Sequence, residues 1–133
     1  MDKGQMKYKC IAFLHNAGNK EQNTMREIMP HVRSAGYANG YVAIPPEHPL
    51  FGKYYDYPEI YVHGGLTFSR PSRDIFEYFD TNAVEMLDGE IPIGYWVFGF
   101  DTFHPGDNPD TCSREWCIEE TTRLKTILEN WNV

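Results

Sequence analysis

The chain has 133 residues, 41% of them hydrophobic and 15% aromatic, and its formal net charge is −7. This length suits a single domain over residues 1–133 with its own core, and the composition excludes a chain that is disordered throughout. The negative charge argues against binding to a nucleic-acid polymer through a basic face, and no segment has the roughly 20 apolar residues of a membrane-spanning helix.

The first third of the chain predicts two strands and a helix. Residues 6–14 alternate and then become continuously apolar, which is typical of a strand that enters a core. Apolar residues at helical spacing predict a short helix around residues 24–35, which Pro30 breaks or restarts. Residues 41–44 predict a second strand, which two prolines close.

The rest of the chain predicts two more strands and two more helices. Residues 59–69 alternate as a third strand, and residues 75–87 predict a short helix. Residues 91–101 are almost continuously apolar, as a central strand buried on both faces is. The last helix is predicted from about residue 113 to residue 130. Its inner face carries Cys117, Thr121, Leu124, Leu128 and Trp131.

These elements predict an α+β fold. We expect a single layered domain in which a sheet of about four strands is packed by the long C-terminal helix and by a shorter N-terminal helix. The odd number of cysteines and an N-terminus without the apolar stretch of an export signal indicate a reducing cytoplasm. We therefore expect Cys10, Cys112 and Cys117 to be small buried hydrophobic side chains.

Polar residues and glycines interrupt the third predicted strand. His63 is followed by Gly64 and Gly65, and glycine weakens a strand unless a bulge or the approach of another molecule requires it. Thr67 and Ser69 share the parity of His63, so these side chains can line one face. We predict that His63 is catalytic. The residues predicted to contact a ligand are Gly64, Gly65, Thr67 and Ser69. The alternative is a bulged strand whose histidine is hydrogen-bonded within the core.

A second polar group follows the fourth predicted strand. Asp101 closes that strand, and His104 and Asp107 follow at intervals of three residues. A carboxylate at a strand end beside a histidine is frequent in sites built at the edges of sheets. We predict that Asp101 and His104 are catalytic and that Asp107 binds a ligand. The alternative is a loop cap, in which the carboxylates accept hydrogen bonds from backbone N–H groups.

Together with His63, this group supplies two imidazoles and two carboxylates. Such a set can hold a divalent metal that ionises a bound water, or it can act without metal when a carboxylate orients a histidine base. The chain contains no compact metal motif such as HExxH and no phosphate-binding glycine motif. The sequence therefore leaves the metal and any cofactor open.

The loop over residues 48–57 is rich in aromatic residues. We predict that His48, Phe51 and Tyr54 cover a flat ring such as a nucleobase, and that Lys53 or Arg70 meets a phosphate. The alternative is that the rings pack down on the sheet.

Several short motifs occur together along the chain: GYVAIP at 40–45, HPLFG at 48–52, VHGGLTFS at 62–69, GFD at 99–101 and HPGD at 104–107. This pattern resembles an uncharacterised family of small bacteriophage and prophage proteins, and the resemblance covers residues 40–128. It implies a viral protein that works in the cytoplasm of a bacterial host. Small accessory phage proteins often act against host defence, so the resemblance implies an anti-defence role.

Three functions follow from these observations. The first is capture of a small nucleotide-like ligand, such as a host immune signal. The second is a hydrolase, such as a phosphoesterase, that uses the same histidines and aspartates. The third is an inhibitor that docks on a host protein through its acidic and aromatic surface. A homo-oligomer is compatible with all three.

Overall fold

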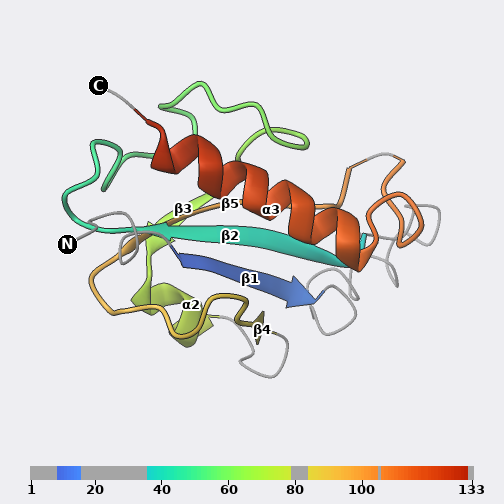
Figure 1. Cartoon of the computed structure of the whole chain (residues 1–133), viewed down its shortest axis with the longest axis horizontal. Helices are drawn as coiled ribbons and strands as arrows, with labels where there is room; N and C mark the ends of the chain where they lie inside the picture. The colour runs from blue at the N-terminus through green and yellow to red at the C-terminus, as the bar shows by residue number, and fades with distance from the viewer. Residues whose placement is uncertain (1–8, 16–35, 79–83, 105, 132–133) are drawn as a thin grey trace.

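The computed structural model describes residues 9–15, 36–78, 84–104 and 106–131 (Figure 1). Within these ranges, five strands form one sheet in the order β3-β5-β2-β1-β4, and every neighbouring pair is antiparallel. The elements are β1 (Lys9–His15), β2 (Ala38–Ile44), β3 (Phe68–Pro71), α2 (Arg73–Tyr78), β4 (Val84–Glu85), β5 (Trp96–Phe100) and α3 (Arg114–Glu129).

The central strands β2 and β5 divide the core into two layers. Val42 and Phe98 belong to the cluster beneath α3, whereas Tyr41 and Val97 belong to a cluster on the opposite face. Neighbouring residues of a strand point to opposite faces, so a strand covered on both sides is apolar throughout. All seven residues of β2 are accordingly buried.

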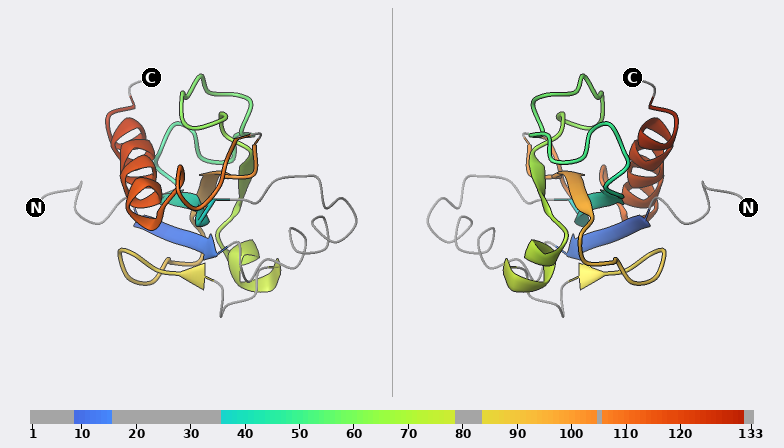
Figure 2. Two further views of the ribbon diagram at one scale, coloured as in Figure 1. Left: turned by 90° about the vertical axis from the view of Figure 1, so that its right-hand side faces the viewer. Right: turned by 90° about the vertical axis from the view of Figure 1, so that its left-hand side faces the viewer.

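Helix α3 covers one face of the sheet (Figure 2). It begins after Ser113, whose hydroxyl accepts a hydrogen bond from the backbone N–H of Trp116, as an N-cap residue does. Its buried residues are Cys117, Thr121, Leu124 and Leu128, and Trp131 packs against the same core. The predicted helix over 113–130 and its inner face are therefore confirmed.

Helix α3 approaches the sheet closely at Gly40. A Cβ atom at this position would lie 2.2 Å from Oγ1 of Thr121 and 2.6 Å from the ring of Phe100. A glycine in β2 thus allows the helix to pack directly on the strand backbone. The Thr121 hydroxyl donates to the carbonyl of Cys117 within the helix, which satisfies this buried polar group.

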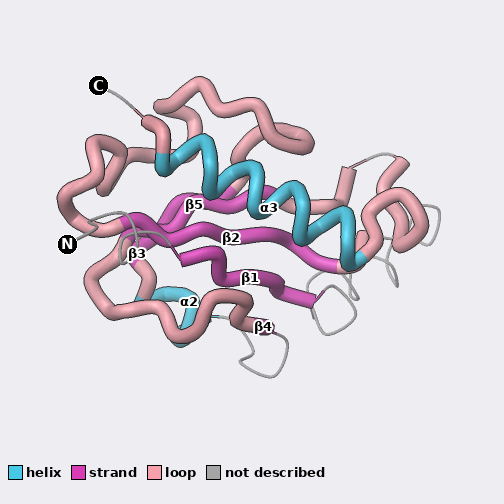
Figure 3. The backbone as a smooth tube through the Cα atoms, viewed as in Figure 1, coloured by secondary structure: helices cyan, strands magenta, loops and turns pink. Residues whose placement is uncertain are grey.

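The third predicted strand is largely wrong. Strand β3 is confined to residues 68–71, and residues 59–67 form a loop that runs over the α3 side of the sheet (Figure 3). Gly64 and Gly65 have φ angles of 68° and 80°, so the chain turns where a strand would need negative φ. The loop is still anchored, because Ile60, Val62 and Leu66 are buried in the core cluster beneath α3.

Two further predictions differ from the structure or fall outside it. The helix predicted over 75–87 is the shorter α2, and residues 84–85 instead pair with β1 as β4. The N-terminal helix predicted around 24–35 lies outside the described residues. An α+β fold with an antiparallel sheet and a long C-terminal helix is confirmed. No helix among the described residues has the length and apolar character needed to cross a membrane.

The loop after β2 is attached to the last turn of α3 by His48. Its Nδ1 accepts a hydrogen bond from the backbone N–H of Leu50 at 3.0 Å, so Nε2 carries the proton and donates to the carbonyl of Leu128 at 2.8 Å. The carbonyls in the last turn of a helix have no partner inside the helix, and the imidazole supplies one. His48 is 5% exposed, and both of its ring nitrogens are held by the backbone. This placement disagrees with its prediction as a ligand-binding residue.

We expect His48→Ala to lower the free energy of unfolding by about 1–3 kcal/mol, because it leaves the N–H of Leu50 without its partner and removes one of the donors to the carbonyl of Leu128. Urea denaturation measures this loss. The exposed neighbour Glu47 provides the control, and a loss for His48→Ala no larger than for Glu47→Ala would contradict the role of the imidazole.

Candidate functional site

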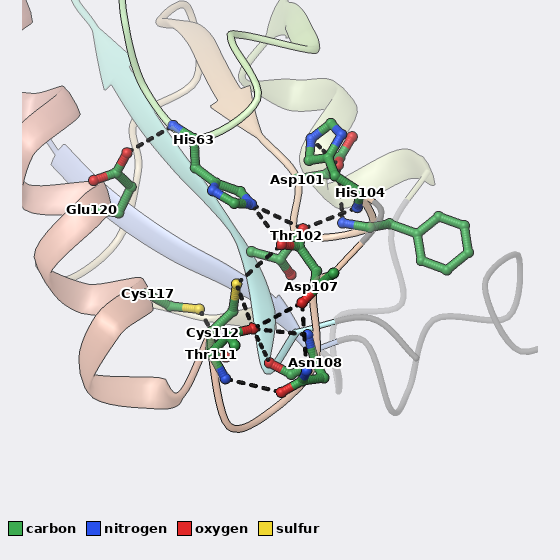
Figure 4. Close-up of polar contacts among 12 residues, drawn as sticks. His63, Asp101, Thr102, His104, Asp107, Asn108, Thr111, Cys112, Cys117 and Glu120 are labelled. Atoms are coloured by element: carbon green, nitrogen blue, oxygen red, sulfur yellow. Dashed lines mark hydrogen bonds and ion pairs between the residues drawn. The ribbon is translucent and has the colours of Figure 1, made fainter. Parts of the chain in front are cut away.

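Three segments meet at the end of the sheet where β5 finishes (Figure 4). They are the turn over 62–65, the loop that follows Phe100, and the chain that enters α3. The loop is fixed at its start by Thr102, which is fully buried. Thr102 donates through Oγ1 to the carbonyl of Ala38 and through its backbone N–H to Oδ1 of Asn39, which ties the loop to the start of β2.

The turn over 62–65 presents His63 beside the β5 loop. The N–H of Gly65 donates to the carbonyl of Val62 at 2.7 Å, which closes a β-turn with His63 and Gly64 at its centre. A β-turn of this kind requires positive φ at its third residue, and glycine supplies it without steric cost. The position also lacks space for a side chain, because a Cβ on Gly64 would lie 2.2 Å from Nε2 of His104. The glycine therefore lets the imidazole of His104 lie against the turn.

His63 is paired with the buried carboxylate of Asp107. Its Nε2 lies 2.8 Å from Oδ1 and 2.9 Å from Oδ2 of Asp107 and donates the hydrogen bond. The imidazole also makes an edge contact with Trp116, with 4.9 Å between the ring centroids. The backbone N–H of His63 donates to Oε2 of Glu120 at 2.7 Å. Two residues of α3 thus fix the ring that Asp107 binds.

His104 is paired with Asp101 in a similar way. Its Nε2 lies 2.9 Å from Oδ1 of Asp101, but this buried nitrogen is not aligned to make a hydrogen bond, so we regard the contact as an electrostatic pairing. Asp101 also accepts the backbone N–H of Phe103. The rings of His104 and His63 contact one another edge to face, with 5.4 Å between their centroids. The side chains of His63 and His104 are 27% and 32% exposed, so solvent reaches both.

Asp107 is the most heavily bonded member of the site. In addition to His63, its carboxylate accepts the backbone N–H of His104 at 2.9 Å and the Cys112 thiol at 3.5 Å. Burial acts to raise the pKa of Asp107, but the hydrogen bonds from His63 and His104 outweigh it and hold the pKa below its ordinary value. Burial raises the pKa of the Cys112 thiol, and the charge of Asp107 adds to this effect. The loop-cap alternative therefore also holds for both aspartates, since each accepts a backbone N–H.

Three of these side chains have the composition of a metal site. Nε2 of His63, a carboxylate oxygen of Asp107 and Sγ of Cys112 all lie within 4.8 Å of one another. Imidazole, carboxylate and thiolate are the ligand types that zinc takes in proteins.

The structure brings together five of the residues predicted for the site. These are His63, Gly64, Asp101, His104 and Asp107. Gly65 follows in the same turn, and Thr67 is exposed and donates its backbone N–H to the carbonyl of Gly99.

Other predicted residues have contacts elsewhere on the sheet. Phe51 contacts the ring of Trp96, the first residue of β5, and Trp96 lies about 13 Å along the strand from Phe100. Ser69 pairs with Phe98 in the middle of β5 and accepts the backbone N–H of Tyr55, and Tyr54 is 74% exposed. Arg70 pairs with Asp74 at 3.5 Å. The 48–57 loop follows the end of β2, where Ile44 pairs with Trp96 at the start of β5.

Sequence reasoning missed Cys112, Trp116 and Glu120. Cys112 stands five residues after Asp107, and the intervening turn, in which its N–H donates to the carbonyl of Asn108, brings the two together. Trp116 and Glu120 are four residues apart, so they share one face of α3, and this face points at the turn of His63. The helical spacing was visible in the sequence, but nothing there indicated what the face contacts.

Comparison of the chain with protein-family models, curated proteins and solved structures finds no match.

We expect Gly64→Ala to displace the imidazole of His104, whereas Gly65→Ala leaves it in place. Both substitutions put an L-residue at positive φ, at a cost of roughly 1–2 kcal/mol. Only the Cβ at position 64 meets the ring, since the space at position 65 is open. The histidine ring signals in NMR spectra and the free energy of unfolding measure the difference, and equal effects of the two substitutions would contradict the packing.

We expect Glu120→Gln to reduce the loss of stability at acid pH. Burial acts to raise the pKa of Glu120, but hydrogen bonds from Arg123 and from the N–H of His63 lower it below its ordinary value. The ionised carboxylate therefore stabilises the fold fully above about pH 4.3, and this contribution is lost as the pH falls through the lowered pKa.

Urea denaturation at neutral pH and at successively lower pH measures this change. Glu119→Gln removes the same charge from an exposed position of α3 and is the control. An identical acid profile for the two variants would show that Glu120 contributes nothing specific.

Proposed function

We propose that the site of His63, Asp101, His104 and Asp107 hydrolyses a phosphoester bond in a small nucleotide-like ligand. The observation that carries this proposal is the pairing of each imidazole with its own carboxylate, at 2.8 Å for His63 and 2.9 Å for His104. The two rings are in contact and partly exposed, so one ligand can reach both. A histidine oriented by a carboxylate is the usual proton-transfer group in hydrolysis.

Each pairing leaves the second ring nitrogen available. Among the described residues, no hydrogen-bond partner contacts Nδ1 of either His63 or His104. In the reaction, a water oxygen attacks phosphorus and the bond from phosphorus to the leaving oxygen breaks. His104 takes the proton from the water and returns it to the leaving oxygen, and the negative charge of Asp101 stabilises the imidazolium that forms in between. His63, which Asp107 holds through Nε2, directs Nδ1 at a phosphoryl oxygen.

A nucleotide is the ligand we favour because an exposed aromatic residue precedes His63 in the chain. Tyr61 stands two residues before His63 in the same loop and is 77% exposed. Stacking of a base on an aromatic side chain contributes about 1–3 kcal/mol and tolerates any base. The resemblance to phage proteins suggests that the ligand is a nucleotide signal of host defence, and the protein would then act in the host cytoplasm.

We expect His104→Ala to lower kcat by about 10²- to 10⁴-fold, the usual contribution of a proton-transfer group, without changing the melting temperature markedly. Cyclic dinucleotides, ADP-ribose derivatives and bis(p-nitrophenyl) phosphate are the substrates to test. Chromatography of the ligand after heat release distinguishes the outcomes. Altered product supports hydrolysis, whereas intact ligand released from the protein indicates capture. The absence of both product and bound ligand would contradict both functions.

Two carboxylates of the same loop provide a matched comparison. Asp101→Asn keeps an oxygen for the N–H of Phe103 but removes the charge beside His104, so we expect turnover to fall. Asp110→Asn makes the same chemical change at an exposed position and should leave turnover unchanged.

A further inference from the structure

The donor atoms of His63, Asp107 and Cys112 are spaced almost as ligands of one metal ion are. Oδ1 of Asp107 lies 2.8 Å from Nε2 of His63 and 3.5 Å from Sγ of Cys112. In tetrahedral zinc sites with bonds of about 2.0–2.3 Å, ligand atoms lie about 3.3–3.8 Å apart. All three donor atoms lie within 4.8 Å of one another, so side-chain movements of about an ångström would bring them to the spacing of ligands around one ion.

Two of the three donor residues are buried and the third is partly exposed, as in a metal site with one coordination position open to solvent. Asp107 and Cys112 are 4% and 2% exposed, whereas the side chain of His63 is 27% exposed. A metal held by these groups would be fixed from the inside and would keep a coordination position toward solvent, as catalytic zinc sites do. Two anionic ligands, the carboxylate and a thiolate, would neutralise a divalent cation in this buried position.

Neighbouring residues hold the ligands in place. The ring of His63 rests against Trp116, and its backbone N–H is bound by Glu120. The carboxylate of Asp107 accepts the backbone N–H of His104. Metal ligands are commonly oriented by such contacts, and their loss weakens metal binding. The Cys112 thiol already points at Asp107, so no rearrangement of the backbone is needed to bring the three donors together.

We propose that His63, Asp107 and Cys112 form a binding site for a divalent cation of the zinc class. The mixed nitrogen, oxygen and sulfur donors favour zinc or cobalt over magnesium and calcium, which prefer oxygen ligands alone. The bound ion replaces the hydrogen bond between His63 and Asp107 and displaces the proton of the Cys112 thiol. This binding does not depend on hydrolysis. If the protein is also a phosphoesterase, the cation rather than the His63 ring would contact the phosphoryl oxygen.

Titration of the chelator-treated full chain with Co²⁺ alone tests the proposal. We expect saturation at one equivalent with a thiolate-to-cobalt charge-transfer band, and a rise in melting temperature with Zn²⁺. Cys112→Ser should abolish the band. Asp107→Asn or His63→Ala should weaken the affinity for Co²⁺ at least about tenfold. Loss of a group that only supports a metal ligand already costs about tenfold, so loss of a ligand should cost no less. Circular dichroism of each variant establishes that it is folded.

The second cysteine of this region is the control. Cys117 is buried five residues further on and donates to the carbonyl of Ala38, away from Asp107, so Cys117→Ala should keep the band. Absence of a band and of a thermal shift in the folded wild type overturns the proposal, as does a band that survives Cys112→Ser. Metal binding without turnover of any phosphoester would leave this inference standing and overturn the proposed function, and turnover by a protein that binds no Co²⁺ or Zn²⁺ would do the reverse.

Discussion

The site depends on a single buried anion, the carboxylate of Asp107. A charged group out of contact with water is costly unless it is hydrogen-bonded, and this carboxylate is bonded by a side chain, a backbone N–H and a thiol. The three donors come from the 62–65 turn, from the β5 loop itself and from the chain entering α3. One unsatisfied oxygen would therefore disturb all three segments, so the carboxylate determines how they meet.

The sheet and α3 place these segments within reach of the carboxylate. Register between β2 and β5 sets where the β5 loop begins, and Thr102 holds that loop to the start of β2. The absence of a side chain at Gly40 lets α3 lie against the strand. Because the helix lies so close, Trp116 and Glu120 can support His63 from the first turns of α3.

The sequence predicted the elements whose signal is local. The spacing of apolar residues in α3 and the continuous apolar run of β5 each reflect burial of that element alone. The strand predicted over residues 59–67 is wrong because alternation of apolar and polar residues also describes a loop that buries Ile60, Val62 and Leu66, and the two glycines, predicted to contact a ligand within a strand, turn the chain instead.

For the site, the grouping of His63 with the β5 loop was predicted from chemistry, since a single glycine pair and scattered polar residues suggested a shared function. The partner of each residue was not predictable, because His63 and Asp107 are separated by 44 positions and only the folded sheet brings them together. The partners of His48 were also not predictable. An isolated histidine in a sequence does not reveal that both of its ring nitrogens are bonded to backbone groups.

The separation of His63 from Asp107 along the chain has a consequence for how local unfolding would affect the site. His63 contacts residues of the β5 loop and of α3, so its surroundings are complete only when the helix lies on the sheet. Local opening of α3 would remove Trp116, Glu120 and the residue that precedes the helix, Cys112, in one event. Occupancy of the site by any small molecule would thus report on the integrity of the whole fold, and it would protect the chain against proteolysis by favouring the closed state.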